Sequence, residues 1–169
     1  MSDALLRDQA AALAKSKPDQ ALVKARSIKG PWYRAQALAC VARYLPKNAV
    51  QIANESSKAA RECDDAYKRV AARAWEIAAL AEVGSVKQAR KSLGEALKDS
   101  DEIVPCASRA EALMLLLAAA SLINSKEVNQ VHDKLKSACS ADKHWRSKRA
   151  LRNAELVRDG SVEPRRFFW

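Results

Sequence analysis

The chain has 169 residues, of which 30% are charged and 5% aromatic, and it carries a formal net charge of +10. Four glycines and five prolines are few for this length, and strong helix formers such as Ala, Leu, Lys and Glu dominate. This composition excludes a sheet-rich fold, whose strands favour β-branched and aromatic residues, and it predicts an all-α protein in one domain.

The chain begins with a helical pattern at residues 3–17. Asp3 precedes the first basic residue, and Arg7 and Asp8 interrupt the apolar positions, so we expect no secretory signal. The most apolar stretch runs from Ala112 to Ile123, which is too short for a membrane-spanning helix of roughly 20 residues. A cytoplasmic protein with no transmembrane segment is therefore expected.

Helical pairs are predicted along the rest of the chain, each with a first helix, a short break and a second helix. An Arg-Ala pair opens each second helix, and these pairs are spaced by 39, 36 and 40 residues. They are Arg34-Ala35, Arg73-Ala74, Arg109-Ala110 and Arg149-Ala150. Alanine there lets two helices approach closely, and arginine can bond the carbonyls of a neighbouring turn or an acid of the next unit. We interpret these arginines as structural.

Pro46, Gly84 and Gly160 follow three of these pairs by 11 or 12 residues and are expected to stop the helices. The remaining second helix runs on to about Asn124, and its segment Ala110 to Ile123 is expected to be the most buried part of the chain. The predicted N-caps of the first helices are Asn48, Ser85 and Ser125.

A recurring helical hairpin that cannot bury its apolar face alone indicates an α-solenoid. We expect a right-handed α-solenoid of about four antiparallel helix pairs plus an N-terminal helix. It forms a single domain over residues 1–160, followed by an aromatic tail at residues 161–169. The predicted parts of the domain are a half-unit at 3–17 and repeats at about 18–46, 47–84, 85–124 and 125–160.

The second-helix segments, such as RAQALACVARYLP and RAEALMLLLAAAS, resemble the second helix of HEAT repeats, in which a basic residue precedes an Ala-rich helix. The helix-turn-helix unit also resembles the tetratricopeptide family, through Ala35, Ala39, Ala42 and Pro46. The resemblance covers roughly residues 18–160. It implies a curved stack of helical hairpins that presents a surface to a protein or peptide partner, and it implies no catalytic residue.

The excess positive charge lies at the two ends of the chain. Residues 1–46 carry eight basic and three acidic residues, and residues 125–169 carry eleven and six. The basic and acidic residues of the middle repeats balance. A solenoid that follows a nucleic-acid backbone should spread basic residues through every repeat, so this distribution weakens a nucleic-acid function without removing it.

The densest basic block is KHWRSKRALR, from Lys143 to Arg152. If this block is helical, the Trp145 ring lies among basic side chains on one face, and the apolar residues lie on the opposite face. The candidate binding residues on this face are Trp145, Lys148, Arg149 and Arg152. The ring could stack on a base or hold an arginine by a cation–π contact. Alternatively, the block is the polar outer face of a terminal repeat.

The tail ends in three bulky aromatics, Phe167, Phe168 and Trp169, after Pro164 has broken any helix. Such residues in solvent favour association, so they either fold back and cap the last hairpin or dock into another chain. They are the remaining candidate binding residues.

The sequence contains no motif for a metal, a cofactor or a catalytic group. Its four cysteines form no CxxC pair and its two histidines are not at i,i+4, which leaves free thiols as the expected state. DNA alkylation-repair glycosylases built from HEAT-like repeats are the one enzyme alternative, for which the candidates are Trp75, Trp145 and Asp142. These lie in different repeats and share no motif.

The sequence therefore predicts a non-enzymatic helical-repeat module that binds a protein or peptide, with no cofactor. The alternative is a nucleic-acid-binding HEAT-like protein that uses the basic, Trp-containing C-terminal helix.

Overall fold

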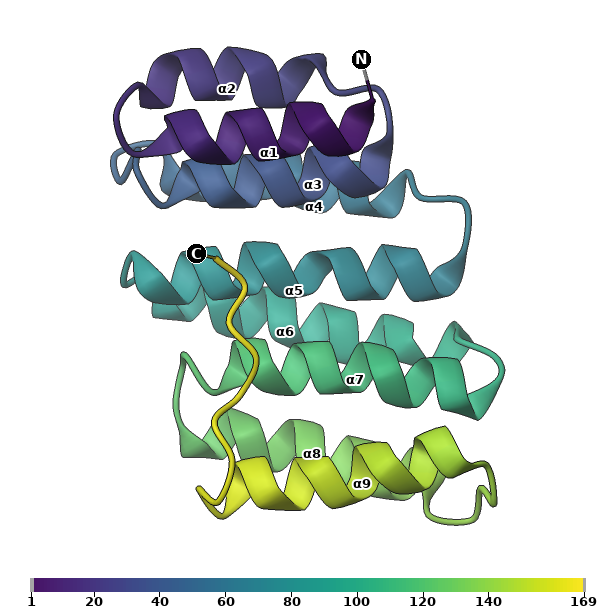
Figure 1. Ribbon diagram of the computed structural model, residues 1–169. Coiled ribbons are helices and arrows are strands. Elements are labelled where there is room, and N and C mark those ends of the chain that lie inside the picture. Colours follow the sequence, from purple (N-terminus) through teal and green to yellow (C-terminus); the bar gives the residue numbers. More distant parts are fainter. Residues whose placement is uncertain (1, 169) are drawn as a thin grey trace.

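The computed structural model describes residues 2–168, and within these residues the chain forms nine α-helices and no strand (Figure 1). This confirms the all-α prediction. In chain order the elements are α1 (Asp3–Ala14), α2 (Pro18–Ser27), α3 (Pro31–Ala42), α4 (Ala49–Arg61), α5 (Ala66–Glu82), α6 (Val86–Asp99), the short 3-10 helix η1 (Ser100–Glu102), α7 (Cys106–Ala120), α8 (Ser125–Cys139) and α9 (Trp145–Arg158).

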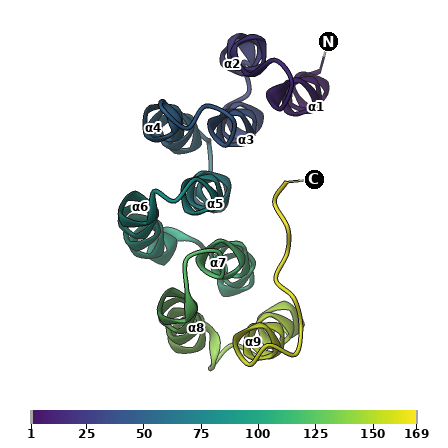
Figure 2. The same ribbon diagram turned by 90° about the vertical axis from the view of Figure 1, so that its left-hand side faces the viewer.

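The helices stand in two columns when they are viewed end-on (Figure 2). One column holds α1, α3, α5, α7 and α9, each packed on the next, and the other holds α2, α4, α6 and α8. The odd-numbered column bends around the C-terminal residues 161–168. We call the side of the odd-numbered helices that faces these residues the inner face; Arg7, Arg43, Trp75, Glu111 and Arg149 are among the residues that line it.

Several helix boundaries follow local signals. Gly84 and Gly160 end α5 and α9 with φ angles of +79° and +80°, a left-handed conformation that L side chains rarely adopt, and both confirm the predicted stops. α7 ends at Ala120, four residues before the predicted end. Asn124 instead caps α8 by accepting from the backbone amides of Lys126 and Glu127, because its side chain reaches the first free amides of that helix.

The predicted N-caps were not borne out as side-chain caps. Ser125 is the first residue of α8 rather than its cap. Asn48 and Ser85 occupy the N-cap positions of α4 and α6, but neither side chain makes a capping hydrogen bond.

The prediction of the most buried segment was wrong. Leu113, Leu116 and Leu117 of α7 are fully buried, but the longest continuous buried run is Val70 to Leu80 of α5. α5 packs on α3, α4, α6 and α7, and the tail covers Trp75 on its remaining side. By contrast, Met114 and Leu115 of α7 line a pocket and are only partly buried.

An arginine recurs at the fourth position of three odd-numbered helices. Arg34 in α3 donates to the carbonyls of Ile28 and Lys29, and Arg69 in α5 donates to those of Cys63 and Asp64. Arg109 in α7 donates to the carbonyls of Ile103 and Asp101. Each guanidinium therefore satisfies carbonyls of the break that precedes its helix, which a helix end leaves without partners.

This register corrects the predicted alignment of the Arg-Ala pairs. In α5 the repeating arginine is Arg69, so α5 begins seven residues before Arg73 rather than close to it. In α9 the fourth position is Lys148, and Arg149 is exposed beside Glu111. Arg34 and Arg109 keep the structural function that was predicted for all four, and Arg73 keeps it by pairing with Glu95 of α6.

Replacing Arg109 with methionine should lower the free energy of unfolding by about 1–3 kcal/mol, because two hydrogen bonds from a charged donor are lost. The same change at Arg149 is the matched control, since that exposed side chain makes a long ion pair, 3.7 Å from Glu111, and a contact with the exposed Trp145 ring, and should cost under about 1 kcal/mol. Urea unfolding of both variants measures the difference. Equal losses of unfolding free energy in the two variants would show that the hydrogen bonds of the fourth-position arginine do not stabilise the fold.

A second series of charged contacts joins the even-numbered helices. Arg26 of α2 pairs with Glu55 of α4 at 2.7 Å, and Arg61 of α4 pairs with Glu95 of α6 at 2.9 Å. Arg90 of α6 pairs with Glu127 of α8 at 2.8 Å. Each even-numbered helix is thus tied to the next by an Arg–Glu pair, although the paired residues occupy different positions along their helices.

Candidate functional site

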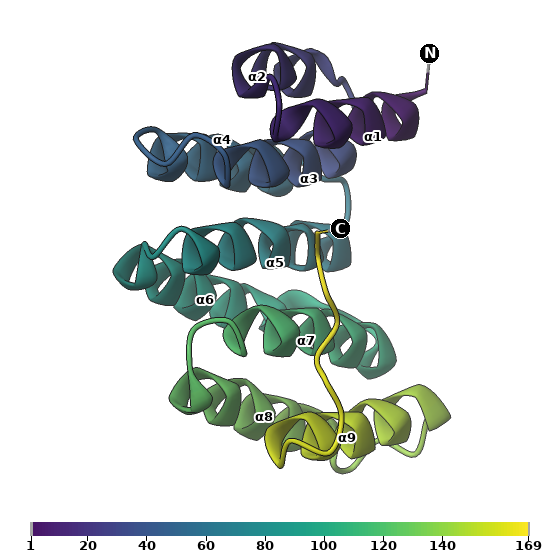
Figure 3. The same ribbon diagram turned by 60° about the vertical axis from the view of Figure 1, so that its left-hand side comes forward.

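The C-terminal tail returns across the inner face. After Gly160 turns the chain, Val162 donates to the carbonyl of Leu156, and residues 163–168 then run alongside α9, α7 and α5 (Figures 2 and 3). The tail therefore folds back, as the first of the two alternatives drawn from the sequence expects, but it extends past the last hairpin to Trp75 of α5. Docking into another chain stays a prediction. Trp169 lies outside the described residues.

Phe167 anchors the tail in an aromatic socket. Its side chain is 6% exposed, and its ring meets the Trp75 ring edge-on, with centroids 5.2 Å apart at 76°. Trp75 meets Trp32 in the same manner at 5.9 Å. The Arg165 guanidinium lies 5.5 Å from the Trp75 ring centroid. These edge-to-face and cation–π geometries are the favourable ones for aromatic rings. We call Trp32 and Trp75 the Trp75 socket.

Phe168 makes a second contact, one helix further along the stack. Arg43 of α3 lies over its ring at 4.1 Å from the centroid, and Arg43 also forms an ion pair with Glu82 of α5. The carboxylate holds the guanidinium in place for the ring. The two phenylalanines of the tail thus bind to neighbouring odd-numbered helices.

Two pockets flank the tail on the inner face. One, of about 590 Å³, lies between α7, α9 and the tail and includes Glu111, Arg146 and Arg149 in its lining. The other, of about 500 Å³, lies between α1, α3, α5 and the tail and includes Arg7 and Arg43. Arg165 lines both pockets. Arginines from both basic ends of the chain are therefore brought to one face.

The basic block of α9 keeps its predicted exposure. Trp145 is 58% exposed, and the guanidinium carbons of Arg146 and Arg149 lie 5.6 and 4.9 Å from its ring centroid. Lys148 and Arg152 are exposed on the same helix. Trp145 and Arg149 thus form one cluster, and Phe167 and Phe168 belong to the separate socket region.

Comparison with protein-family models, with curated proteins and with solved structures finds no match for this chain. The function is therefore inferred from the geometry of the inner face.

Sequence reasoning missed four residues of this face: Arg7, Arg43, Arg165 and, as an aromatic socket, Trp75. Arg43 and Arg165 contact aromatic rings that are distant in sequence, and Arg7 lies 5.4 Å from the centroid of the Tyr33 ring. The single tryptophan among the small residues of α5 gave no sign that the tail would cover it. An Arg-x-Phe spacing at 165–167 was the only local signal of the contact.

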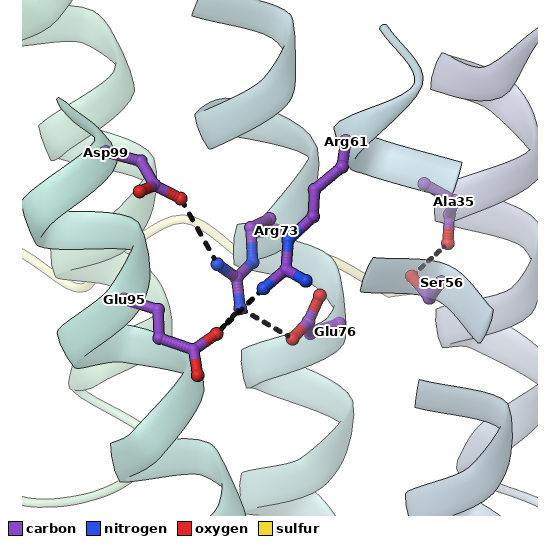
Figure 4. Close-up of polar contacts among 7 residues, drawn as sticks. All are labelled: Ala35, Ser56, Arg61, Arg73, Glu76, Glu95 and Asp99. Carbon is purple, nitrogen blue, oxygen red and sulfur yellow. Dashed lines mark hydrogen bonds and ion pairs between the residues drawn. The ribbon is translucent and has the colours of Figure 1, made fainter. Parts of the chain in front are cut away.

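A charge cluster with a buried centre joins α4, α5 and α6 (Figure 4). Arg73 is 1% exposed and pairs with Glu76 at 3.4 Å and with Glu95 at 3.0 Å. Asp99 lies 3.6 Å from it, and Arg61 shares Glu95. In the same region Ser56 donates to the carbonyl of Ala35 at 2.7 Å.

Burial raises the pKa of the Glu76 carboxyl above its ordinary value, although Arg73, Ser92 and Ser57 act to lower it. A shifted carboxyl can indicate a reactive site. Here Glu76 and Arg73 are both enclosed by packed helices, so the cluster serves to connect three helices rather than to contact a ligand.

The four cysteines are free. The Sγ atoms of Cys106 and Cys139 lie 2.7 Å apart between α7 and α8, and burial together with Cys106 raises the pKa of Cys139 to about 12. Within residues 2–168, no group of three or more His, Cys, Asp or Glu side chains is placed to hold a metal ion.

The three candidates for a glycosylase-like site are not brought together. Trp75 lines the pocket between α1, α3 and α5, and neither Trp145 nor Asp142 lines it. Asp142 instead accepts a hydrogen bond from Ser147 at 2.6 Å. None of the helices described here is both long and apolar enough to cross a membrane.

Proposed function

We propose that the chain is a non-enzymatic interaction module that binds a protein or peptide on its inner face. Its architecture is proposed as a right-handed α-solenoid of HEAT- or tetratricopeptide-like repeats, with about four antiparallel helix pairs after an N-terminal helix. The alternating columns, the recurring fourth-position arginine and the Arg–Glu pairs between even-numbered helices support a repeat organisation. The domain limits 1–160 and a cytoplasmic location belong to this proposal.

One observation carries the proposal: an extended segment of the chain itself lies along the inner face with Phe167 buried in the Trp75 socket. A surface that accommodates one extended segment has the shape that peptide recognition requires. The pockets on either side of that segment leave room for further contacts, and their arginines favour a partner with acidic groups nearby.

The proposal is tested with the full-length chain carrying an affinity tag. Proteins captured from a cell extract are identified by mass spectrometry and rebound in purified form. Arg146→Glu on the inner face should weaken the binding of the partner by about tenfold or more, because a complementary charge becomes repulsive. Lys91→Glu is the control, since this exposed lysine lies on α6 in the other column. A partner that binds both variants equally well contradicts the inner face as its site.

Nucleic-acid binding is a second candidate, favoured by the exposed Trp145 ring between two guanidiniums and by the arginines of both basic ends on one face. Bases stack on exposed aromatic rings, and basic side chains neutralise phosphates.

In that case Arg149→Glu combined with Arg152→Glu should weaken retention on immobilised DNA and reduce the salt slope of binding by about two, about one for each lost phosphate contact. The melting temperature should change little, because both side chains are exposed. Lys91→Glu combined with Lys126→Glu is the control for net charge. A folded α9 variant that elutes at an unchanged salt concentration removes this helix from the nucleic-acid hypothesis.

A further inference from the structure

The tail is held on the inner face by side chains alone. Among the described residues, no hydrogen bond joins residues 163–168 to the helices, and the last backbone contact is that of Val162. Only Phe167 is buried in this segment, whereas Arg165 and Arg166 are exposed. A segment attached in this manner can leave without breaking the hydrogen bonds of any helix.

The contacts of the tail follow a simple chemical pattern. The Arg165 guanidinium lies over the Trp75 ring, Phe167 packs edge-on against the same tryptophan, and Phe168 lies under Arg43. Glu82, which pairs with Arg43, lines the groove beside residues 163–168. The face therefore contacts an arginine that lies two positions before the first of two phenylalanines.

We propose that residues 163–168 are a resident, exchangeable ligand, and that the Trp75 socket binds in their place an extended peptide of a partner protein with the same Arg-x-Phe-Phe chemistry. This inference rests on the proposed function and specifies the partner of the same face. The tail competes as a tethered ligand, whose effective concentration is about millimolar for a short linker. A partner peptide must overcome that competition, so the tail sets a threshold for binding.

The test uses the full-length chain with Phe167→Ala and Phe168→Ala, which removes the two anchors of the tail and leaves the socket intact. The probe is the synthetic peptide SVEPRRFF, which reproduces residues 161–168. Isothermal titration calorimetry should show one-to-one binding at least about tenfold tighter to this variant than to the wild-type chain, because the tethered competitor is gone. A second variant, Arg165→Glu, weakens the tail while both phenylalanines remain, and it should give a smaller gain.

The matched control probe is SVEPRRAA, which should bind the double variant at least about tenfold more weakly than SVEPRRFF. Equal binding of the two peptides, or no saturable binding of SVEPRRFF to the folded double variant, overturns the inference. Loss of folding in the double variant also overturns it, because an exchangeable ligand can be removed without unfolding the helices. If a captured partner still depends on Arg146 while SVEPRRFF does not bind, the inference fails and the proposed function stands.

Discussion

Replacing Arg73 with methionine should lower the free energy of unfolding by about 3–5 kcal/mol at neutral pH. Methionine keeps much of the side-chain length, so the main loss is the positive charge beside Glu76, which is itself 1% exposed. Removing one partner of a buried ion pair leaves the other charge without compensation, which is among the most costly single changes in a protein interior. Urea unfolding followed by circular dichroism measures this loss.

The loss of unfolding free energy caused by Arg73→Met should depend on pH. The protonation of the Glu76 carboxyl determines whether this loss grows or shrinks as the pH rises. Burial raises its pKa in the folded protein, so the stability that this group contributes is fully present below its unfolded pKa of about 4.3 and is lost as the pH rises through the folded pKa. Arg73 acts to lower that pKa, and its removal raises the pKa further. The penalty of Arg73→Met should therefore be smaller at pH 4 than at pH 7.5.

Two further variants separate the charge effect from packing. Adding Glu76→Gln to Arg73→Met should recover part of the loss at pH 7.5, because the amide removes the uncompensated charge and keeps Ser57 and Ser92 within reach. Arg61→Met, which removes an exposed partner of Glu95, should cost under about 1 kcal/mol. A penalty that is the same at both pH values, with no recovery in the double variant, would show that Glu76 is not the source of the effect.

Leu116→Ala should lower the free energy of unfolding by about 2–5 kcal/mol. Leu116 is fully buried in α7, and truncation removes apolar contacts and leaves a cavity that neighbouring helices fill only in part. Lys126→Ala, an exposed change at the start of α8, should stay within about 0.5 kcal/mol of the wild type. Equal melting temperatures for the two variants would contradict the assignment of α7 to the core.

The helices themselves could be predicted because their signals are local. Gly84 and Gly160 stop their helices through their own backbone conformation, and the apolar run around Leu116 specifies a buried helix by composition alone. The charge imbalance between the ends and the middle of the chain could also be counted directly.

The register of the recurring arginine could be predicted only in part. Arg69 and Arg73 lie one helical turn apart on the same side of α5, so a periodic pattern fits either of them equally well. Only the break before α5 decides between them, because Arg69 reaches the carbonyls of Cys63 and Asp64. Arg73 falls instead among acids of α5 and α6, where it is enclosed.

The candidate site was decided by the tertiary structure. By itself the sequence determined an all-α chain, the glycine stops of two helices and a buried helix at α7. It also determined a tail of aromatic residues that need a surface to pack against. It did not determine which surface the tail packs against, because the contacts of Phe167 with Trp75 and of Phe168 with Arg43 join residues about a hundred positions apart. Such contacts follow from the curvature of the odd-numbered column, which is the sum of many helix–helix packings and is encoded at no single position.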